Sequence, residues 1–243
     1  MPSTAEGRRP HRPSLVITID GPGGVGKSTT AKLLSKRLGL GYLDTGATYR
    51  ALAYAVRLAG LHPVADAERI ARMARRLPLA MRLSPDGALR ILLDGADISR
   101  EIRTEEVTES AALVSPHPAV RTAMVRRQRE LADRRGVVVE GRDTGSVVFP
   151  RAAYKFFLDA DPAIRARRRQ QELARLYGSR TPLAQIREQL HFRDGLDRTR
   201  RVGPLVRPPG AIAINTTHRT APQVVRTMLR HVRTRRRAGD RRP

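Results

Sequence analysis

A glycine-rich stretch at residues 21–28 has the residue types and spacing of a phosphate-binding loop. The pattern Gly21-x-x-x-x-Gly26-Lys27-Ser28 follows an apolar run and precedes a helical pattern. Glycines let backbone N–H groups wrap a polyphosphate without a Cβ in the way, and the next helix directs its positive end at the same anion. Lys27 can reach the β- and γ-phosphates, and Ser28 can offer its hydroxyl to Mg²⁺. We expect a nucleoside-triphosphate site here, the alternative being a glycine-rich turn before an ordinary helix.

Strand and helix patterns alternate along the chain, which indicates a parallel, doubly wound α/β sheet. Short apolar runs predict strands at 15–20, 41–43, 136–139, 154–158 and 211–214. Periodic apolar positions predict helices at 27–38, about 44–58, 66–77, 104–114, 118–135 and 162–176, and helices that begin near 181 and 220. Ligands bind at the carboxyl ends of strands in such sheets. Motifs at 21–28, 44–50, 140–143 and 159–161 each follow a predicted strand, so we expect them to meet in one active site.

A predicted β-rich insertion interrupts this alternation of strands and helices. Two apolar runs, 79–83 and 89–93, flank the turn-forming residues 84–87 and predict a β-hairpin in an insertion that ends near Ile98.

Composition limits the classes of function. The chain has 243 residues, a net charge of +24 and no cysteine, which excludes disulfides, thiol catalysis and cysteine-based zinc sites. No apolar run approaches the ~20 residues that span a bilayer, and no signal-peptide segment is present, so we expect a cytoplasmic protein without a membrane partner. The charge fits either nucleic-acid binding or an enzyme that handles anionic nucleotides. The small number of aromatic residues, four Phe, five Tyr and no Trp, argues against base stacking on a nucleic acid.

Several motifs together resemble the bacterial cytidylate kinase family of phosphate-loop nucleoside monophosphate kinases. They are the phosphate loop, Asp44-Thr45-Gly46-Ala47-Thr48-Tyr49-Arg50, Arg126-Arg127-Gln128-Arg129, Gly141-Arg142-Asp143 followed by Val147-Val148-Phe149-Pro150, and Arg193-Asp194-x-x-Asp197-Arg198-x-Arg200. The resemblance runs from about residue 15 to 233. It implies a three-layer α/β/α kinase with a central parallel sheet, a β-containing monophosphate-binding insertion and a helical lid.

The resemblance also implies a division of the chain. Residues 1–14 and 234–243 are expected to be a disordered tail and a basic tail around a kinase domain at 15–233. Its core takes in 15–44, 136–161 and 201–233, the insertion about 45–135, and the lid about 162–200.

The implied reaction is phosphoryl transfer from ATP-Mg²⁺ to CMP or dCMP, by a monomer that does not bind nucleic acid. The resemblance assigns catalysis to Lys27, Arg142, Arg168 and Arg200. ATP is expected to bind Gly21, Pro22, Gly23, Gly24, Val25, Gly26, Lys27, Ser28, Thr29, Arg168 and Arg169, with Ser28 on the metal. The acceptor nucleotide is expected to bind Thr45, Arg50, Arg121, Arg142, Asp143, Arg193, Asp197 and Arg200, with Arg121 and Asp143 at the cytosine.

Other interpretations remain open at this point. The family often has a serine where this chain has Ala112, with Ser110 and Ser115 nearby, so one contact to the base is in doubt. Arg168 and Arg169 can also be a solvated helix face, and Arg193 and Asp197 an ordinary surface pair. The alternative functions are a kinase for another monophosphate, UMP or AMP, and a nucleic-acid-binding NTPase.

Overall fold

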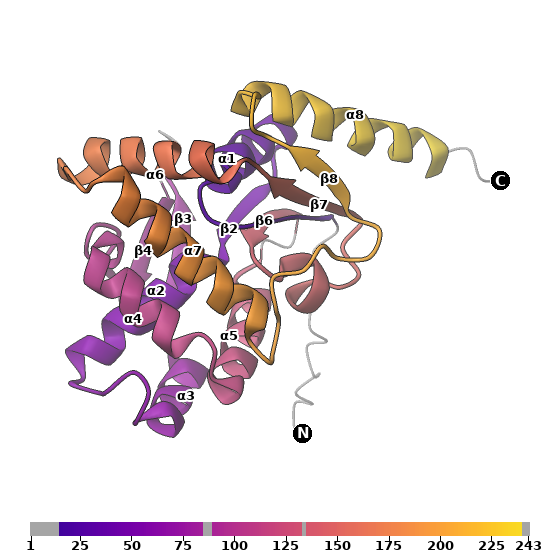
Figure 1. Ribbon diagram of the computed structural model, residues 1–243. Helices are drawn as coiled ribbons and strands as arrows, with labels where there is room; N and C mark the ends of the chain where they lie inside the picture. The colour runs from indigo at the N-terminus through magenta and orange to yellow at the C-terminus, as the bar shows by residue number, and fades with distance from the viewer. Residues whose placement is uncertain (1–14, 85–88, 133–134, 240–243) are drawn as a thin grey trace, which may run out of the picture.

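The computed structural model describes residues 15–84, 89–132 and 135–239 (Figure 1). The expectations for residues 1–14 and for most of the hairpin turn, 85–88, lie outside the described residues. The last helix, α8 (Ala221–Gly239), continues past the domain boundary that the sequence predicts at residue 233.

Five parallel strands form the central sheet, in the order β2-β6-β1-β7-β8. Their bounds are β1 (Val16–Asp20), β2 (Gly41–Asp44), β6 (Val137–Gly141), β7 (Tyr154–Asp159) and β8 (Ile212–Asn215). The valine run of β6 is buried on both faces of the sheet, because Val138 packs into the large core while Val137 and Val139 pack with Leu43 in a smaller one. The parallel α/β sheet expected from the sequence is confirmed.

Helices cover both faces of this sheet. The crossover from β1 to β2, through α1 (Lys27–Leu38), runs in the opposite direction to the crossovers that enter β6 and β7. Since such crossovers are right-handed, α1 lies on the opposite face from those connections. Figure 1 shows α8 lying along α1. Gly39 ends α1 in the left-handed conformation, with φ 62°, as the sequence predicts for a C-cap.

The insertion between β2 and β6 contains helices and a second, small sheet. Strands β3 (Leu79–Leu83) and β4 (Leu89–Leu93) pair antiparallel, which confirms the predicted hairpin, and β5 (Ala96–Asp97) pairs with β4. No sequence pattern predicted β5 or the 3-10 turn η1 (Glu101–Arg103), and the last helix of the insertion ends at residue 131 instead of the predicted 135. The helices are α2 (Thr45–Leu58), α3 (Ala67–Arg76), α4 (Glu105–Val114) and α5 (Pro118–Leu131).

Two further helices, α6 (Pro162–Tyr177) and α7 (Leu183–Thr199), form the predicted lid segment and lie side by side (Figure 1). Asp161 caps α6 by accepting hydrogen bonds from the N–H groups of Ala163 (2.8 Å) and Ile164 (3.3 Å), as its position before Pro162 predicts. Ala166, Ile186 and Leu190 form a small core of their own between the two helices.

One turn after β6 departs from the sequence expectations. Residues Thr144–Val148 form a π-helical turn, η2, which no sequence pattern predicts. The buried carboxylate of Asp20 holds this turn by accepting hydrogen bonds from the N–H of Thr144 (2.7 Å), its hydroxyl (2.7 Å) and the N–H of Gly145 (2.8 Å). Asp20 thereby fixes the segment that follows the Gly141-Arg142-Asp143 motif.

Candidate active site

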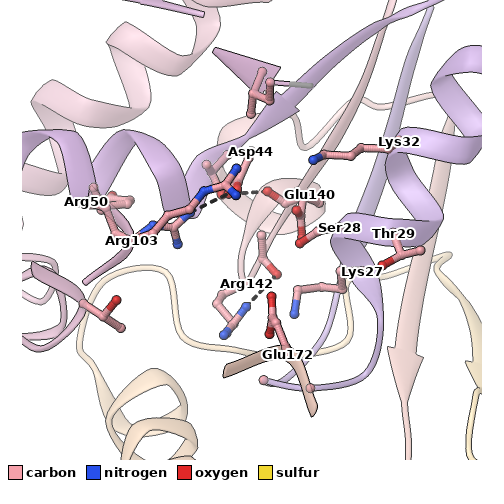
Figure 2. Close-up of a pocket in the computed structure, with 18 of the residues that line it drawn as sticks. Lys27, Ser28, Thr29, Lys32, Asp44, Arg50, Arg103, Glu140, Arg142 and Glu172 are labelled. Atoms are coloured by element: carbon pink, nitrogen blue, oxygen red, sulfur yellow. Dashed lines mark hydrogen bonds and ion pairs between the residues drawn. The ribbon is translucent and has the colours of Figure 1, made fainter. Parts of the chain in front are cut away.

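A cleft of about 910 Å³ lies where the carboxyl ends of β1, β2 and β6 meet the insertion and the lid (Figure 2). The structure brings most of the predicted site residues into this one cleft. Those that line it are Gly23, Gly24, Lys27, Ser28, Thr29, Thr45, Arg50, Arg142, Asp143, Arg169, Arg193, Asp197 and Arg200. Arg121 and Arg168 do not line it, and Gly21, Pro22, Val25 and Gly26 complete the loop that borders it.

The phosphate loop has the backbone that its glycines predict. Gly24 and Gly26 have φ values of 75° and 87°, which side chains with a Cβ rarely adopt. The side chain of Lys27 is buried, and its ammonium group donates a hydrogen bond of 2.6 Å to the carbonyl oxygen of Pro22. Burial, and then repulsion by Arg142, lower the pKa of Lys27 to about 7. The loop therefore holds Lys27 in a place where a bound anion, such as a phosphate, would favour its protonated form.

Glu140 lies beside Ser28 of the phosphate loop (Figure 2), and the sequence predicts no role for it. Its carboxylate accepts a hydrogen bond of 2.8 Å from the hydroxyl of Tyr42, and the side chain of Ser28 lies next to it (Figure 2). Burial, and then the charge of Asp44, raise the pKa of Glu140. The parallel register pairs Ile19 with Glu140, so this carboxylate ends a strand adjacent to the one that leads into the loop. Its position at the end of a predicted strand could have marked Glu140 as a site residue, but the sequence did not show which strands are neighbours.

Ser28 and Glu140 together present the oxygen ligands that Mg²⁺ prefers. Figure 2 shows the two side chains adjacent, beside Lys27. Within the described residues, no group of three or more His, Cys, Asp or Glu is placed to hold a metal ion. This arrangement fits a magnesium ion that takes few ligands from the protein and the rest from phosphates and water.

The start of α2 supplies the other wall of the cleft. Asp44 caps this helix by accepting a hydrogen bond of 2.9 Å from the N–H of Ala47, and its second oxygen pairs with Arg50 at 3.2 Å. Thr45 donates a hydrogen bond of 2.8 Å to the carbonyl oxygen of Glu140. The Asp-Thr-Gly motif therefore ties the insertion to β6 and directs Arg50 at the cleft.

A chain of ion pairs links β6 to the end of the lid. The Nε of Arg142 lies 2.7 Å from Asp197, and Arg200 lies 3.1 Å from the other oxygen of Asp197 and 3.4 Å from Asp143. Burial opposes ionisation of Asp197, but Arg142 and Arg200 outweigh it and lower the pKa of this carboxyl. Asp197 thus orients two arginines at once, which the sequence could not show.

Arg121 lies behind Asp143 instead of in the cleft. It is 1% exposed, its guanidinium donates a hydrogen bond to Asp143, and it lies over the ring of Tyr49 at 5.6 Å. Gly203 covers this pair so closely that a Cβ there would collide with both side chains. Asp143 lines the cleft and Arg121 supports it, whereas the resemblance implies that both face the base.

Arg193 differs from the other predicted arginines in its contacts. Among the described residues it makes no hydrogen bond or ion pair, yet it lines the cleft from α7. Burial, and then repulsion by Arg142, lower the pKa of Arg193 to about 10. Its charge is therefore available for an anion.

The two arginines of α6 that the resemblance assigns to ATP, Arg168 and Arg169, have different surroundings. Arg168 donates hydrogen bonds to the hydroxyl of Thr216 (3.1 Å) and to its carbonyl oxygen (2.7 Å), so the structure places it against the segment between β8 and α8. Arg169 lines the cleft and pairs with Glu172 at 2.9 Å. The structure therefore does not bring Arg168 and Arg169 together over the cleft, as the resemblance implies.

Arg165 and Asp194 hold α6 and α7 against the phosphate loop, and the sequence predicted no role at the site for either residue. The pair is almost completely buried, with a separation of 2.5 Å. Arg165 donates to the carbonyl oxygen of Gly23 at 3.1 Å, while Asp194 accepts from the N–H of Gly23 at 3.1 Å. Both backbone polar groups of one loop residue are thus occupied by the lid.

At the end of α4, Ala112 and Ser115 line the wall of the cleft, whereas Ser110 does not. The hydroxyl of Ser115 donates a weak hydrogen bond of 3.4 Å to the carbonyl oxygen of Ala112. Of the two serines near Ala112, only Ser115 is placed to meet a ligand.

Comparison with known proteins agrees with this geometry. The family model for cytidylate kinase matches residues 17–234. The chain is 43% identical over 220 residues to a cytidylate kinase of Caldanaerobacter subterraneus subsp. tengcongensis, covering 90% of this chain and 95% of the relative. It is 46% identical over 217 residues to one from Mycolicibacterium paratuberculosis, covering 87% and 92%. A shikimate kinase of Acinetobacter baumannii aligns more weakly, with a TM-score of 0.42 and 15% identity over 91% of this chain and 95% of that one. By the extent and identity of the sequence matches, this chain belongs to the cytidylate kinase family.

Proposed function

We propose that this protein transfers the γ-phosphoryl group of ATP to CMP or dCMP, giving ADP and CDP or dCDP. The observation that carries the proposal is the single cleft in which a phosphate loop faces arginines from the insertion, β6 and the lid. Moving a phosphoryl group between nucleotides requires in-line positioning and neutralisation of charge more than covalent chemistry. The family match favours cytidylate over UMP or AMP as acceptor, and over a nucleic-acid-binding NTPase.

On the donor side, the loop from Gly21 to Thr29 holds the triphosphate. Lys27 neutralises charge on the transferred group, and Arg169 approaches from the lid. Ser28 and Glu140 would hold Mg²⁺, Ser28 directly and Glu140 by its carboxylate or through water. When bound with ATP, that ion neutralises phosphate charge and fixes the β- and γ-phosphates.

On the acceptor side, the phosphate of CMP binds Arg50, Arg142 and Arg193, with Thr45 beside them. Asp197 positions Arg142 and Arg200 and reaches the sugar. Asp143 accepts a hydrogen bond from the cytosine amino group, since a carboxylate has acceptor capacity left after pairing with Arg121 and Arg200. Arg168 acts indirectly, by fixing the root of α6.

The insertion at about 45–135 and the lid at about 162–200 are proposed to close over the substrates and exclude water. The hydrogen bond of 2.7 Å from Gln189 of α7 to Glu105 of α4 supports such closure, because it links the two parts. We further propose a cytoplasmic monomer. No helix among the described residues has the length and apolar character needed to cross a membrane.

The direct test offers ATP-Mg²⁺ with CMP, dCMP, UMP, AMP or GMP and measures ADP. Rapid ADP formation with CMP and dCMP is expected. Equal rates with AMP or UMP would assign the protein to another monophosphate, and ADP formation that does not depend on any monophosphate would indicate an NTPase.

Discrimination against UMP should depend on Asp143. Uracil presents an oxygen where cytosine presents its amino group, and each mismatched buried polar group costs about 1–3 kcal/mol. We expect kcat/KM for CMP to exceed that for UMP by roughly 10- to 100-fold. Asp143→Asn should shrink this ratio, because its amide can donate to uracil O4. The ratio of the two kcat/KM values is the measurement, since loss of folded protein cancels in it; an unchanged ratio would remove Asp143 from the base.

Binding of ATP should take up a proton. The pKa of Lys27 is about 7 in the free protein, so this side chain is mostly neutral at about pH 8. A bound triphosphate favours the ammonium form and raises its pKa, so ATP affinity should fall as pH rises above about 7. Titration calorimetry in two buffers of different ionisation enthalpy measures the uptake. Lys27→Ala should abolish this proton uptake. The control variant Arg37→Ala, which removes an exposed charge from α1, should retain it. Proton uptake by both variants would assign the proton to another group.

A further inference from the structure

The basic side chains that line the cleft divide into those with partners and those without. Arg50, Arg142, Arg169 and Arg200 each pair with a carboxylate, and Lys27 donates to a carbonyl oxygen. Three arginines of the cleft, Arg103, Arg175 and Arg193, make no hydrogen bond or ion pair within the part of the chain that the structure describes. Arg193 belongs to the predicted set, whereas Arg103 and Arg175 do not. Of these two, Arg175 comes from α6, and only Arg103 comes from the insertion, on the same side of the cleft as Arg50 (Figure 2).

Arg103 is the last residue of the turn η1, in the monophosphate-binding insertion. Its neighbour Ile102 is 1% exposed and anchors the turn in the main core. Figure 2 shows Arg103 and Arg50 entering the cleft from one side, opposite Lys27, Ser28 and Lys32 of α1. Arg103 also acts electrostatically on Tyr177 at the end of α6, so it lies where the insertion meets the lid.

We propose that Arg103 is a further substrate-binding residue, which contacts the phosphate of the acceptor monophosphate. The inference rests on the proposed function and extends it to a residue outside the implied set. A guanidinium on an anchored turn that faces other cations has no favourable partner until an anion enters. Its side chain comes from the same insertion as Arg50 and from the same side of the cleft, which favours the acceptor phosphate over the triphosphate held by α1.

The unpaired arginines of the cleft come from two different parts of the chain. Arg103 belongs to the insertion and Arg193 to the lid, so an acceptor phosphate bound by both would bridge the two parts. The phosphate then neutralises charges that otherwise repel each other across the cleft. Binding of the acceptor would in this way favour closure of the site around it.

The test compares Arg103→Ala, Arg103→Lys and Arg100→Ala with the wild type in steady-state kinetics. Arg100 lies on the same turn, is exposed and does not line the cleft, so its variant makes the same change of charge outside the site. We expect Arg103→Ala to raise KM for CMP about 10- to 100-fold, since hydrogen bonds to charged groups are among the strongest. The lysine variant should recover part of this loss, KM for ATP should stay within about threefold, and Arg100→Ala should match the wild type.

Inhibition by cytidine, which has no phosphate, separates a phosphate contact from damage to the nucleoside site. Its inhibition constant should be the same in Arg103→Ala and in the wild type. An unchanged KM for CMP in Arg103→Ala, an equal loss of cytidine binding, or a larger rise in KM for ATP than for CMP would overturn the inference. If the wild type itself does not phosphorylate CMP, the proposed function fails instead. If Arg103→Ala does not fold, Arg103→Lys becomes the test. Its KM for CMP must then exceed that of the wild type, while its KM for ATP stays within about threefold.

Discussion

A Lys27→Ala protein is expected to fold and to phosphorylate CMP about 10²–10³ times more slowly than the wild type. The ammonium group is held in a preorganised position in the loop, where it neutralises charge on the transferred phosphoryl group. Folding should survive, because burial and Arg142 lower the pKa of Lys27 to about 7, which means that the folded protein disfavours its charged form. The substitution therefore removes a charge that catalysis needs but that the fold does not favour.

The measurement is kcat for CMP, with circular dichroism and thermal unfolding as the check on folding. Arg37→Ala removes a positive charge from the same helix at an exposed position outside the cleft, and it should retain wild-type kcat. A folded Lys27→Ala protein with wild-type kcat would contradict the assignment of residues 21–28 as the donor site.

An Asp194→Ala protein is expected to lose about 3–5 kcal/mol of its free energy of unfolding. Arg165 would keep a buried guanidinium without its carboxylate partner, and the N–H of Gly23 would lose its acceptor. Since both groups belong to the junction of lid and phosphate loop, the KM for ATP should rise as well. Urea denaturation measures the first effect and steady-state kinetics the second.

Two controls distinguish the effect of breaking a buried ion pair from that of breaking an exposed one. Glu130→Ala breaks exposed pairs with Arg126 and Arg127 on α5 and should cost less than about 1 kcal/mol. The double variant Arg165→Ala/Asp194→Ala should lose less than the sum of its single variants, because it leaves no unpaired charge. Additive losses, or an Asp194→Ala protein as stable as Glu130→Ala, would show that the pair does not couple the lid to the loop.

The glycines and charged residues of the phosphate loop could be predicted because its chemistry depends on residues within one short segment. Gly21 to Ser28 are close in the sequence, so their spacing alone determines the backbone and the helix that follows. The same holds for the caps at Gly39 and Asp161, which act on neighbouring turns. The alternation of strands and helices likewise predicted the parallel sheet, since handedness rules leave few other arrangements.

The roles of the α6 arginines could not be predicted from their spacing. Arg165, Arg168 and Arg169 fall on one helical face, but that face is wide enough to meet three different surfaces. Docking of α6 directs Arg165 at the phosphate loop, Arg168 at the segment after β8 and Arg169 at the cleft. Periodicity shows which residues share a face and does not fix the rotation of the helix against its neighbours.

The remaining residues of the site were decided by the tertiary structure alone. Glu140 meets Ser28 because β6 lies beside β1, Asp194 meets Arg165 because α7 packs on α6, and Arg103 reaches the cleft because the core holds η1. These partners are far apart in the sequence, and no local pattern records which distant segments become neighbours. The sequence by itself determined the phosphate loop, the parallel sheet and most of the arginines that line the cleft. Only the packing of the sheet, insertion and lid decided which of those arginines are paired, which are buried behind the site and which remain available to bind phosphate.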